Sequence, residues 1–100
     1  MLRNFIRAQR SWSEKTFGPG RRTRGLCEHI RKELAEIEQA PADLTEWVDV
    51  IILALDGAWR CGNTPLEIER AMLSKQALNF VRSWPKPGSE DDPMEHVRKS

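Results

Sequence analysis

Apolar residues recur along most of the chain at spacings of three and four, which is the period of an α-helix. The clearest stripe consists of Leu26, Ile30, Leu34 and Ile37. No segment alternates apolar and polar residues between hairpin turns, so no strand is predicted. The pattern therefore predicts an all-α protein, a bundle of about four main helices and a short terminal helix.

Proline, glycine and capping residues set the expected helix boundaries. Pro41 ends the second helix, because the residue before a proline avoids the helical region. Asp43 with Glu46, and Thr64 with Glu67, have the spacing of a capping box at the start of a helix. One hundred residues suit a single domain, residues 1–100. The expected helices cover residues 2–14, 23–39, 43–60 and 64–84, with a short one at 93–98.

The third expected helix carries carboxylates beside its most apolar segment. Val50 to Leu55 is an unbroken apolar run, with Asp49 before it and Asp56 after it. The two aspartates are seven residues apart, so they return to within about 20° of the same helix face. A helix that is apolar nearly all round is buried, so both are expected to point inward. An ionised carboxylate is buried only when it is paired or binds a metal.

Two carboxylate pairs lie on the second and third expected helices. Glu33 and Glu36 are three residues apart, as are Glu46 and Asp49, so each pair shares a helix surface. The short connection makes the two helices antiparallel neighbours, so the pairs can meet. Gathered carboxylates repel one another, and a divalent cation such as Mg²⁺, which takes oxygen ligands and phosphates, removes that repulsion. The candidate metal ligands are Glu33, Glu36, Glu46, Asp49 and Asp56.

Less specific interpretations of these acids stay open. Glu46 can close the capping box with Asp43, and Glu33 and Glu36 can pair with neighbouring cations. Asp49 can pair with an arginine. The metal hypothesis rests on the combination, because two such pairs on consecutive helices are less easily explained as surface charge.

The fourth expected helix offers groups that suit a polyphosphate. Lys75, Asn79 and Arg82 fall on one face at spacings of four and three. A lysine charge, an amide and an arginine fork are phosphate-binding groups. By itself this face is also compatible with a solvated surface.

The charge balance, the apolar segments and the cysteines of the chain exclude several other classes of protein. Lys and Arg number 16 and Asp and Glu 15, so no strongly basic footprint for a nucleic acid polymer is present. The longest apolar run is far too short to cross a membrane, and the N-terminus lacks the apolar core of a signal peptide. Cys27 and Cys61 form no metal-binding pattern. A cytoplasmic protein is expected.

These motifs resemble a known superfamily. The patterns Glu33-x-x-Glu36, Glu46-x-x-Asp49 and Lys75-x-x-x-Asn79-x-x-Arg82 are similar to those of the all-α, MazG-like nucleoside triphosphate pyrophosphohydrolases. The segments RSWSEKTFG, HIRKELAEIE, DLTEWVDVIILALDGAWR and NFVRSWP resemble a small phage and enterobacterial group of dATP/dGTP diphosphohydrolases, over most of residues 7–97. Glu36 and Glu46 are separated by nine residues, fewer than is usual, so whether Glu46 is a ligand or a cap stays open.

The resemblance implies a fold, a reaction and a site. It implies an α-helical homodimer or homotetramer that uses Mg²⁺ or Mn²⁺ to cleave dATP or dGTP between the α and β phosphates. The products are the monophosphate and pyrophosphate. The implied metal ligands are Glu33, Glu36, Glu46 and Asp49, and the implied phosphate contacts are Lys75, Asn79 and Arg82; Asp56 is added from its helix face.

The expected mechanism is metal-assisted attack of a water on the α phosphorus. Glu36 is the favoured acceptor of the water's proton, with Glu33 as the second candidate catalytic residue. The nucleobase of the substrate is expected to lie near Trp12, Gln9 and Ser13. Two alternatives remain: a non-catalytic helical interaction module of a phage or prophage, and a pyrophosphohydrolase for pyrimidine or non-standard nucleotides.

Overall fold

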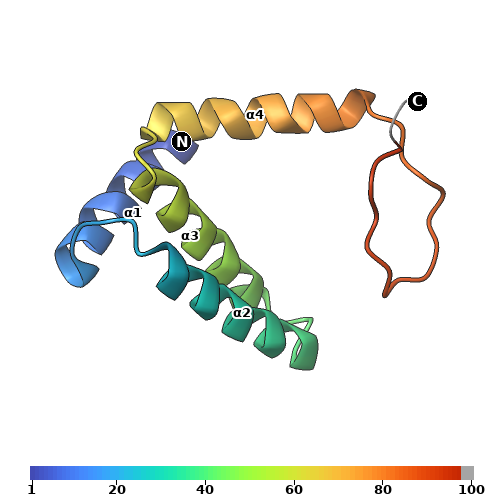
Figure 1. The fold of residues 1–100 in the computed structure, drawn as a ribbon, viewed down its shortest axis with the longest axis horizontal. Helices are drawn as coiled ribbons and strands as arrows, with labels where there is room; N and C mark the ends of the chain where they lie inside the picture. Colours follow the sequence, from blue (N-terminus) through green and yellow to red (C-terminus); the bar gives the residue numbers. More distant parts are fainter. Residues whose placement is uncertain (98–100) are drawn as a thin grey trace. The chain divides into compact units, whose positions relative to one another are not determined.

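The computed structural model describes residues 1–97, and their regular structure is helical (Figure 1). No strand occurs in these residues apart from one isolated bridge between Ser83 and Val97, so the all-α prediction is confirmed. The chain divides into two compact units, Met1–Glu69 and Arg70–Ser100, each of which is described by itself. Whether residues 1–100 behave as one domain stays a prediction. The helices are α1 (Leu2–Phe17), α2 (Thr23–Gln39), α3 (Leu44–Arg60) and α4 (Pro65–Val81).

The helix boundaries agree with the predicted ones, with three differences. Helix α1 continues to Phe17 and ends where Gly18, at φ 86°, donates its N–H to the Glu14 carbonyl. Helix α4 ends at Val81, earlier than predicted. The predicted last helix is wrong for residues 93–97, which are not helical; its end at Arg98 lies outside the described residues. So short a segment cannot repay the cost of helix nucleation, and the Val97 N–H is donated to the Ser83 carbonyl instead.

One of the two predicted capping boxes forms completely. Thr64 accepts from the Glu67 N–H at 3.1 Å, and the Thr64 N–H donates to Glu67 at 3.0 Å. At α3, Asp43 accepts from the Thr45 N–H at 3.0 Å, but its own N–H is donated to the Ala40 carbonyl. The Glu46 carboxylate is therefore not engaged as a cap and is free to face α2.

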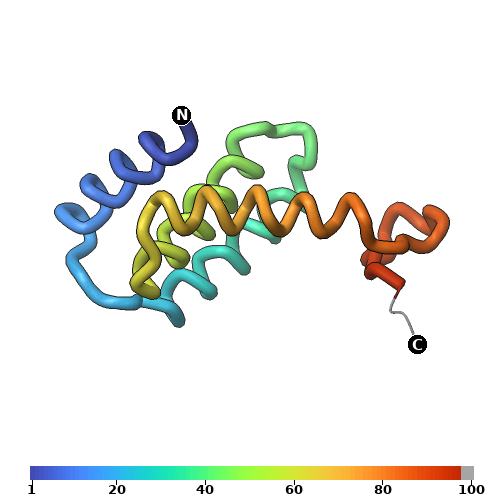
Figure 2. Tube along the Cα trace, turned by 90° about the horizontal axis from the view of Figure 1, so that it is seen from above, coloured from blue at the N-terminus to red at the C-terminus, as the bar shows by residue number. Residues whose placement is uncertain are grey.

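In the first unit, α2 and α3 form an antiparallel hairpin and lie side by side (Figures 1 and 2). Helix α1 packs on α3 and contacts its C-terminal half through buried side chains. The first turn of α4 belongs to this unit, and Glu69 accepts from the Arg3 guanidinium at 2.9 Å. The buried apolar core consists of Ile6, Leu55, Trp59 and Ile68.

The chain leaves much apolar surface open. On α3, Trp47 and Ile51 are 49% and 54% exposed, and Asp49 is also exposed. The expectation that α3 is buried all round and that Asp49 points inward is therefore wrong for this chain, because α1 and α2 cover only part of the helix. On α4, Phe80 and Val81 are 79% and 80% exposed. None of the helices in residues 1–97 has the length and apolar character needed to cross a membrane.

Candidate metal centre

The hairpin brings carboxylates from α2 and α3 together. Glu33, Glu46 and Asp49 each present an oxygen, and these three oxygens all lie within 4.8 Å of one another. Glu33 is buried, Glu46 is half-buried and Asp49 is exposed, so the cluster has a closed side and an open side. Oxygen donors at this spacing are the set that a hard divalent cation uses, and the open side leaves room for water or a phosphate.

Glu36 joins this cluster through Glu46. Burial, followed by hydrogen bonds to Glu33 and Glu36 and by their negative charge, raises the pKa of Glu46 to about 7. The hydrogen bonds and the charge repulsion require Glu33 and Glu36 to lie close to Glu46. The structure therefore brings together the two carboxylate pairs that the sequence placed on consecutive helices.

Two oxygens of the cluster lack a conventional partner. The Oε2 atoms of Glu33 and Glu46 are buried, and neither has a hydrogen-bond donor within the described residues. The other oxygen of Glu33 lies 3.3 Å from Nε2 of His29. Buried acceptors without a donor are unfavourable, and buried carboxylates are normally paired or bound to a metal. The donor set and its orphaned oxygens thus fit a divalent cation.

The raised pKa of Glu46 predicts an unusual dependence of stability on pH. The folded protein retains a proton that the unfolded chain releases between its ordinary pKa of 4.5 and about 7. Without metal, the contribution of Glu46 to stability therefore falls as pH rises through this range. Thermal unfolding in EDTA, followed by circular dichroism from pH 4.5 to 8, should show a steeper decline for wild type than for Glu46→Gln. Parallel curves would contradict the assigned environment of Glu46.

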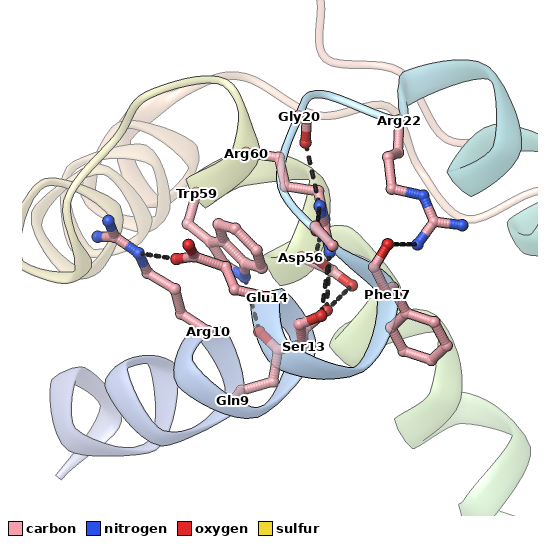
Figure 3. Close-up of polar contacts among 11 residues, drawn as sticks. Gln9, Arg10, Ser13, Glu14, Phe17, Gly20, Arg22, Asp56, Trp59 and Arg60 are labelled. Atoms are coloured by element: carbon pink, nitrogen blue, oxygen red, sulfur yellow. Dashed lines mark hydrogen bonds and ion pairs between the residues drawn. The ribbon is translucent and has the colours of Figure 1, made fainter.

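Asp56 is compensated by an arginine rather than by the carboxylate cluster. Arg60 donates from Nε to Asp56 Oδ1 at 2.6 Å, and Ser13 donates to Asp56 Oδ2 at 2.9 Å (Figure 3). Arg60 also donates to the carbonyls of Gly18 and Gly20, at 2.8 and 3.0 Å. Both oxygens of Asp56 are therefore used inside the protein. The structure does not bring Asp56 into the group formed by Glu33, Glu46 and Asp49.

The three candidate contacts to the nucleobase, all on α1, differ in burial and in their hydrogen bonds. Gln9 is buried and accepts from the indole N–H of Trp59 at 2.8 Å. Ser13 is fully buried, and its hydroxyl donates to Asp56 and accepts from Arg60. Trp12 is 57% exposed, so its ring is accessible for stacking. Sequence reasoning did not single out Trp59 or Arg60, although the i,i+4 spacing of Asp56 and Arg60 is a recognised signal of an ion pair.

The candidate phosphate contacts lie in the second unit. Lys75 is exposed, and Asn79 and Arg82 are partly exposed. The indole N–H of Trp84 donates to the backbone carbonyl of Asn79 at 2.9 Å. This bond does not use the side-chain amide of Asn79. Their role in binding phosphate stays a prediction.

Comparisons with known proteins give the chain a family. A family model described as dATP/dGTP pyrophosphohydrolase matches residues 5–100. The Eaa protein of Salmonella phage P22 is 36% identical over 94 residues, which are 93% of this chain and 29% of that protein. The chain thus spans less than a third of that relative's length. A solved structure matches with a TM-score of 0.74 and 28% identity, over 98% of each chain. It is described as a cyanophage S-2L MazG-like pyrophosphohydrolase bound to dGDP and three catalytic Mn²⁺ ions per active site.

These matches confirm the resemblance predicted from the motifs. They bear out the all-α MazG-like fold, the relation to phage proteins and the similarity to nucleoside triphosphate pyrophosphohydrolases. The family match extends over nearly the whole chain, including both carboxylate pairs and the predicted phosphate contacts Lys75, Asn79 and Arg82. The protein is a member of the dATP/dGTP pyrophosphohydrolase family.

Proposed function

We propose that this chain hydrolyses dATP and dGTP to the monophosphate and pyrophosphate, with Mg²⁺ or Mn²⁺ as cofactor. The observation that carries this proposal is the cluster of Glu33, Glu46 and Asp49, whose oxygens lie within 4.8 Å of one another. Family membership supports the reaction, and the cyanophage neighbour, which holds dGDP and Mn²⁺, supports the metal and the purine base.

Each carboxylate of the cluster receives a proposed role. Glu33, Glu46 and Asp49 hold the metal, with Glu36 beside them. When bound, the metal supplies charge neutralisation for the phosphates and acidifies a water. Glu36 is half-buried next to Glu46 and accepts the proton of the attacking water, with Glu33 as the alternative acceptor. Asp56 is left out of the ligand set, because Arg60 and Ser13 occupy both of its oxygens.

The substrate-binding groups are proposed in the same way. Lys75, Asn79 and Arg82 contact the phosphates, since they combine two cations and an amide along α4 and just after its end at Val81. Trp12 offers an exposed ring on which the base stacks.

We also propose that the chain assembles as a homodimer or homotetramer. Trp47 and Ile51 on α3, and Phe80 and Val81 on α4, are large apolar side chains that are about half exposed or more. Apolar surface on this scale is typical of a protein–protein interface, and closed symmetric assembly of identical chains is the commonest way to bury it.

Pyrophosphate release from the eight common nucleoside triphosphates tests the reaction. Release should require Mg²⁺, stop in EDTA and be fastest with dATP or dGTP. Metal-dependent release led by a pyrimidine would keep the chemistry and change the substrate. Absence of release from protein that is folded by circular dichroism would favour the interaction module. Light scattering on the same sample should give a multiple of 11.5 kDa, and a monomer would contradict the assembly.

A further inference from the structure

The surface of α1 carries a hollow that is lined mainly by basic residues, called the basic hollow below. Its volume is about 440 Å³, within the range of roughly 300–1,000 Å³ that is typical of small-molecule sites. Five of its lining residues lie within about two turns of α1, and the sixth is the first residue of α4. All six belong to the first unit, and they are Arg7, Arg10, Ser11, Glu14, Lys15 and Pro65.

The charges around the basic hollow are unbalanced. Three cations, Arg7, Arg10 and Lys15, share its wall with one carboxylate, Glu14. Glu14 already accepts from Nε of Arg10 at 2.9 Å (Figure 3), and neither Arg7 nor Lys15 forms an ion pair within residues 1–97. The whole chain has a net charge of only +1, so the positive excess is local. Cations gathered in this way repel one another, and an anion between them removes the repulsion.

Neighbouring side chains hold the two guanidinium groups of the basic hollow in place. Nε of Arg10 is bonded to Glu14, and Cζ of Arg10 lies 5.9 Å from the centre of the Trp59 ring, within the range of a cation–π contact. Nη1 of Arg7 donates to Oδ1 of Asn4 at 3.2 Å. Each contact uses only one of the five N–H groups of its arginine, so both guanidinium groups keep donors for a ligand.

We propose that the basic hollow binds the phosphate groups of a small molecule. Two oriented guanidinium groups, the Lys15 ammonium and the Ser11 hydroxyl are donors that match phosphate oxygens. A small ligand fits better than a nucleic acid polymer, because a polymer needs an extended basic surface and the chain has 16 basic and 15 acidic residues. This site does not depend on the proposed hydrolysis.

The basic hollow is separate from the carboxylate cluster. Arg10 lies over Trp59, which follows Asp49 on α3 by ten residues, a separation of roughly 15 Å along the helix axis. Helix α1 also contacts the C-terminal half of α3, whereas Glu46 and Asp49 lie in its N-terminal half. An anion in the basic hollow is therefore a second ligand, additional to any phosphate at the metal centre.

Binding of inorganic pyrophosphate in EDTA tests the site without turnover. Without metal, the carboxylate cluster repels an anion, so binding reports on basic groups. Pyrophosphate should bind wild type in titration calorimetry and shift the backbone amide NMR signals of residues 7–15. In the double variant Arg7→Gln with Lys15→Gln, the dissociation constant should rise about 10-fold or more, because charge-assisted hydrogen bonds are lost. Unshifted amides of residues 7–15 in folded wild type would overturn the proposal.

A matched double variant controls for the loss of charge. Arg24 and Lys32 are exposed on α2 and are eight residues apart, as Arg7 and Lys15 are on α1. Arg24→Gln with Lys32→Gln should leave the affinity for pyrophosphate unchanged. An equal loss of affinity in both double variants would show a general charge effect rather than a site, and would overturn the proposal. Circular dichroism confirms that each variant is folded.

A third double variant distinguishes the basic hollow from the predicted phosphate contacts. In Lys75→Gln with Arg82→Gln, pyrophosphate should still shift the amides of residues 7–15. Disappearance of these shifts, together with unchanged binding in the Arg7 and Lys15 variant, would overturn the proposal.

The source of the phosphate is distinguished by repeating the titration with dADP. Tighter binding of dADP than of pyrophosphate, with shifts that still include residues 7–15, would support a nucleotide as the ligand. Equal binding, or tighter binding of pyrophosphate, would support an inorganic polyphosphate at the same site.

Discussion

Replacing Glu33 by glutamine is expected to lower kcat/KM for pyrophosphate release by about 100-fold or more, the scale seen when a group that stabilises transition-state charge is lost. Glu33 is the buried member of the carboxylate cluster, and its Oε2 has no donor within the described residues. Glutamine keeps the shape of the side chain but removes the negative charge that holds a cation. Affinity for Mn²⁺ should fall together with activity.

Stability distinguishes a metal ligand from a structural acid. In EDTA, Glu33→Gln should be no less stable than wild type, because the variant relieves repulsion between Glu33 and Glu46. The matched control is Glu38→Gln, a change at an exposed glutamate on the same helix that should leave activity and Mn²⁺ affinity unchanged. Titration calorimetry, steady-state kinetics and urea unfolding provide the measurements. Full activity in Glu33→Gln would exclude Glu33 as an essential metal ligand.

Replacing Arg60 by leucine is expected to destabilise the folded protein by about 3–5 kcal/mol, as is typical when one partner of a buried ion pair is removed. The Arg60 side chain is 1% exposed and pairs with Asp56 at 2.6 Å. Its loss leaves the Asp56 carboxylate buried without a cation. The carbonyls of Gly18 and Gly20 would lose their donor as well.

A double-mutant cycle isolates the ion pair. Arg60→Leu, Asp56→Leu and the double variant are compared by urea unfolding in EDTA, and the double variant should lose less stability than the two single losses added together. Single losses below about 1 kcal/mol, as for an exposed pair, would contradict the buried environment. Mn²⁺ affinity of Asp56→Asn gives a separate test, since a structural Asp56 leaves it nearly unchanged whereas a metal ligand does not.

The parts of the molecule that depend on local pattern could be predicted from the sequence. The spacing of apolar residues and the position of helix-breaking residues predicted a helix at residues 23–39, and α2 covers Thr23–Gln39 in the structure. The meeting of the two carboxylate pairs was also predictable. It requires only that residues three apart share a helix face and that a short loop makes two helices antiparallel neighbours.

The parts that depend on tertiary environment were not predictable in the same way. A wide apolar face on α3 predicted burial on all sides, yet Asp49 is exposed, because helix periodicity does not reveal which faces find a partner. From the sequence, Asp56 was interpreted as a metal ligand, and Arg60 four residues later was not weighed as its partner. The bond between Gln9 and Trp59 joins positions fifty residues apart, for which no local pattern exists.

The contacts of Arg60 also constrain how this fold can vary among homologous proteins. Its guanidinium donates to the backbone carbonyls of Gly18 and, as Figure 3 shows, of Gly20, and every residue type supplies a backbone carbonyl. Substitutions in the connection between α1 and α2 at positions other than Gly18 and Gly20, whose φ angles of 86° and 103° favour glycine, therefore leave these acceptors in place. An insertion or deletion there moves both carbonyls away from Arg60. Relatives that inherit the Asp56–Arg60 pair should accordingly inherit the length of this connection more strictly than its sequence, and should gain or lose the pair and the length together.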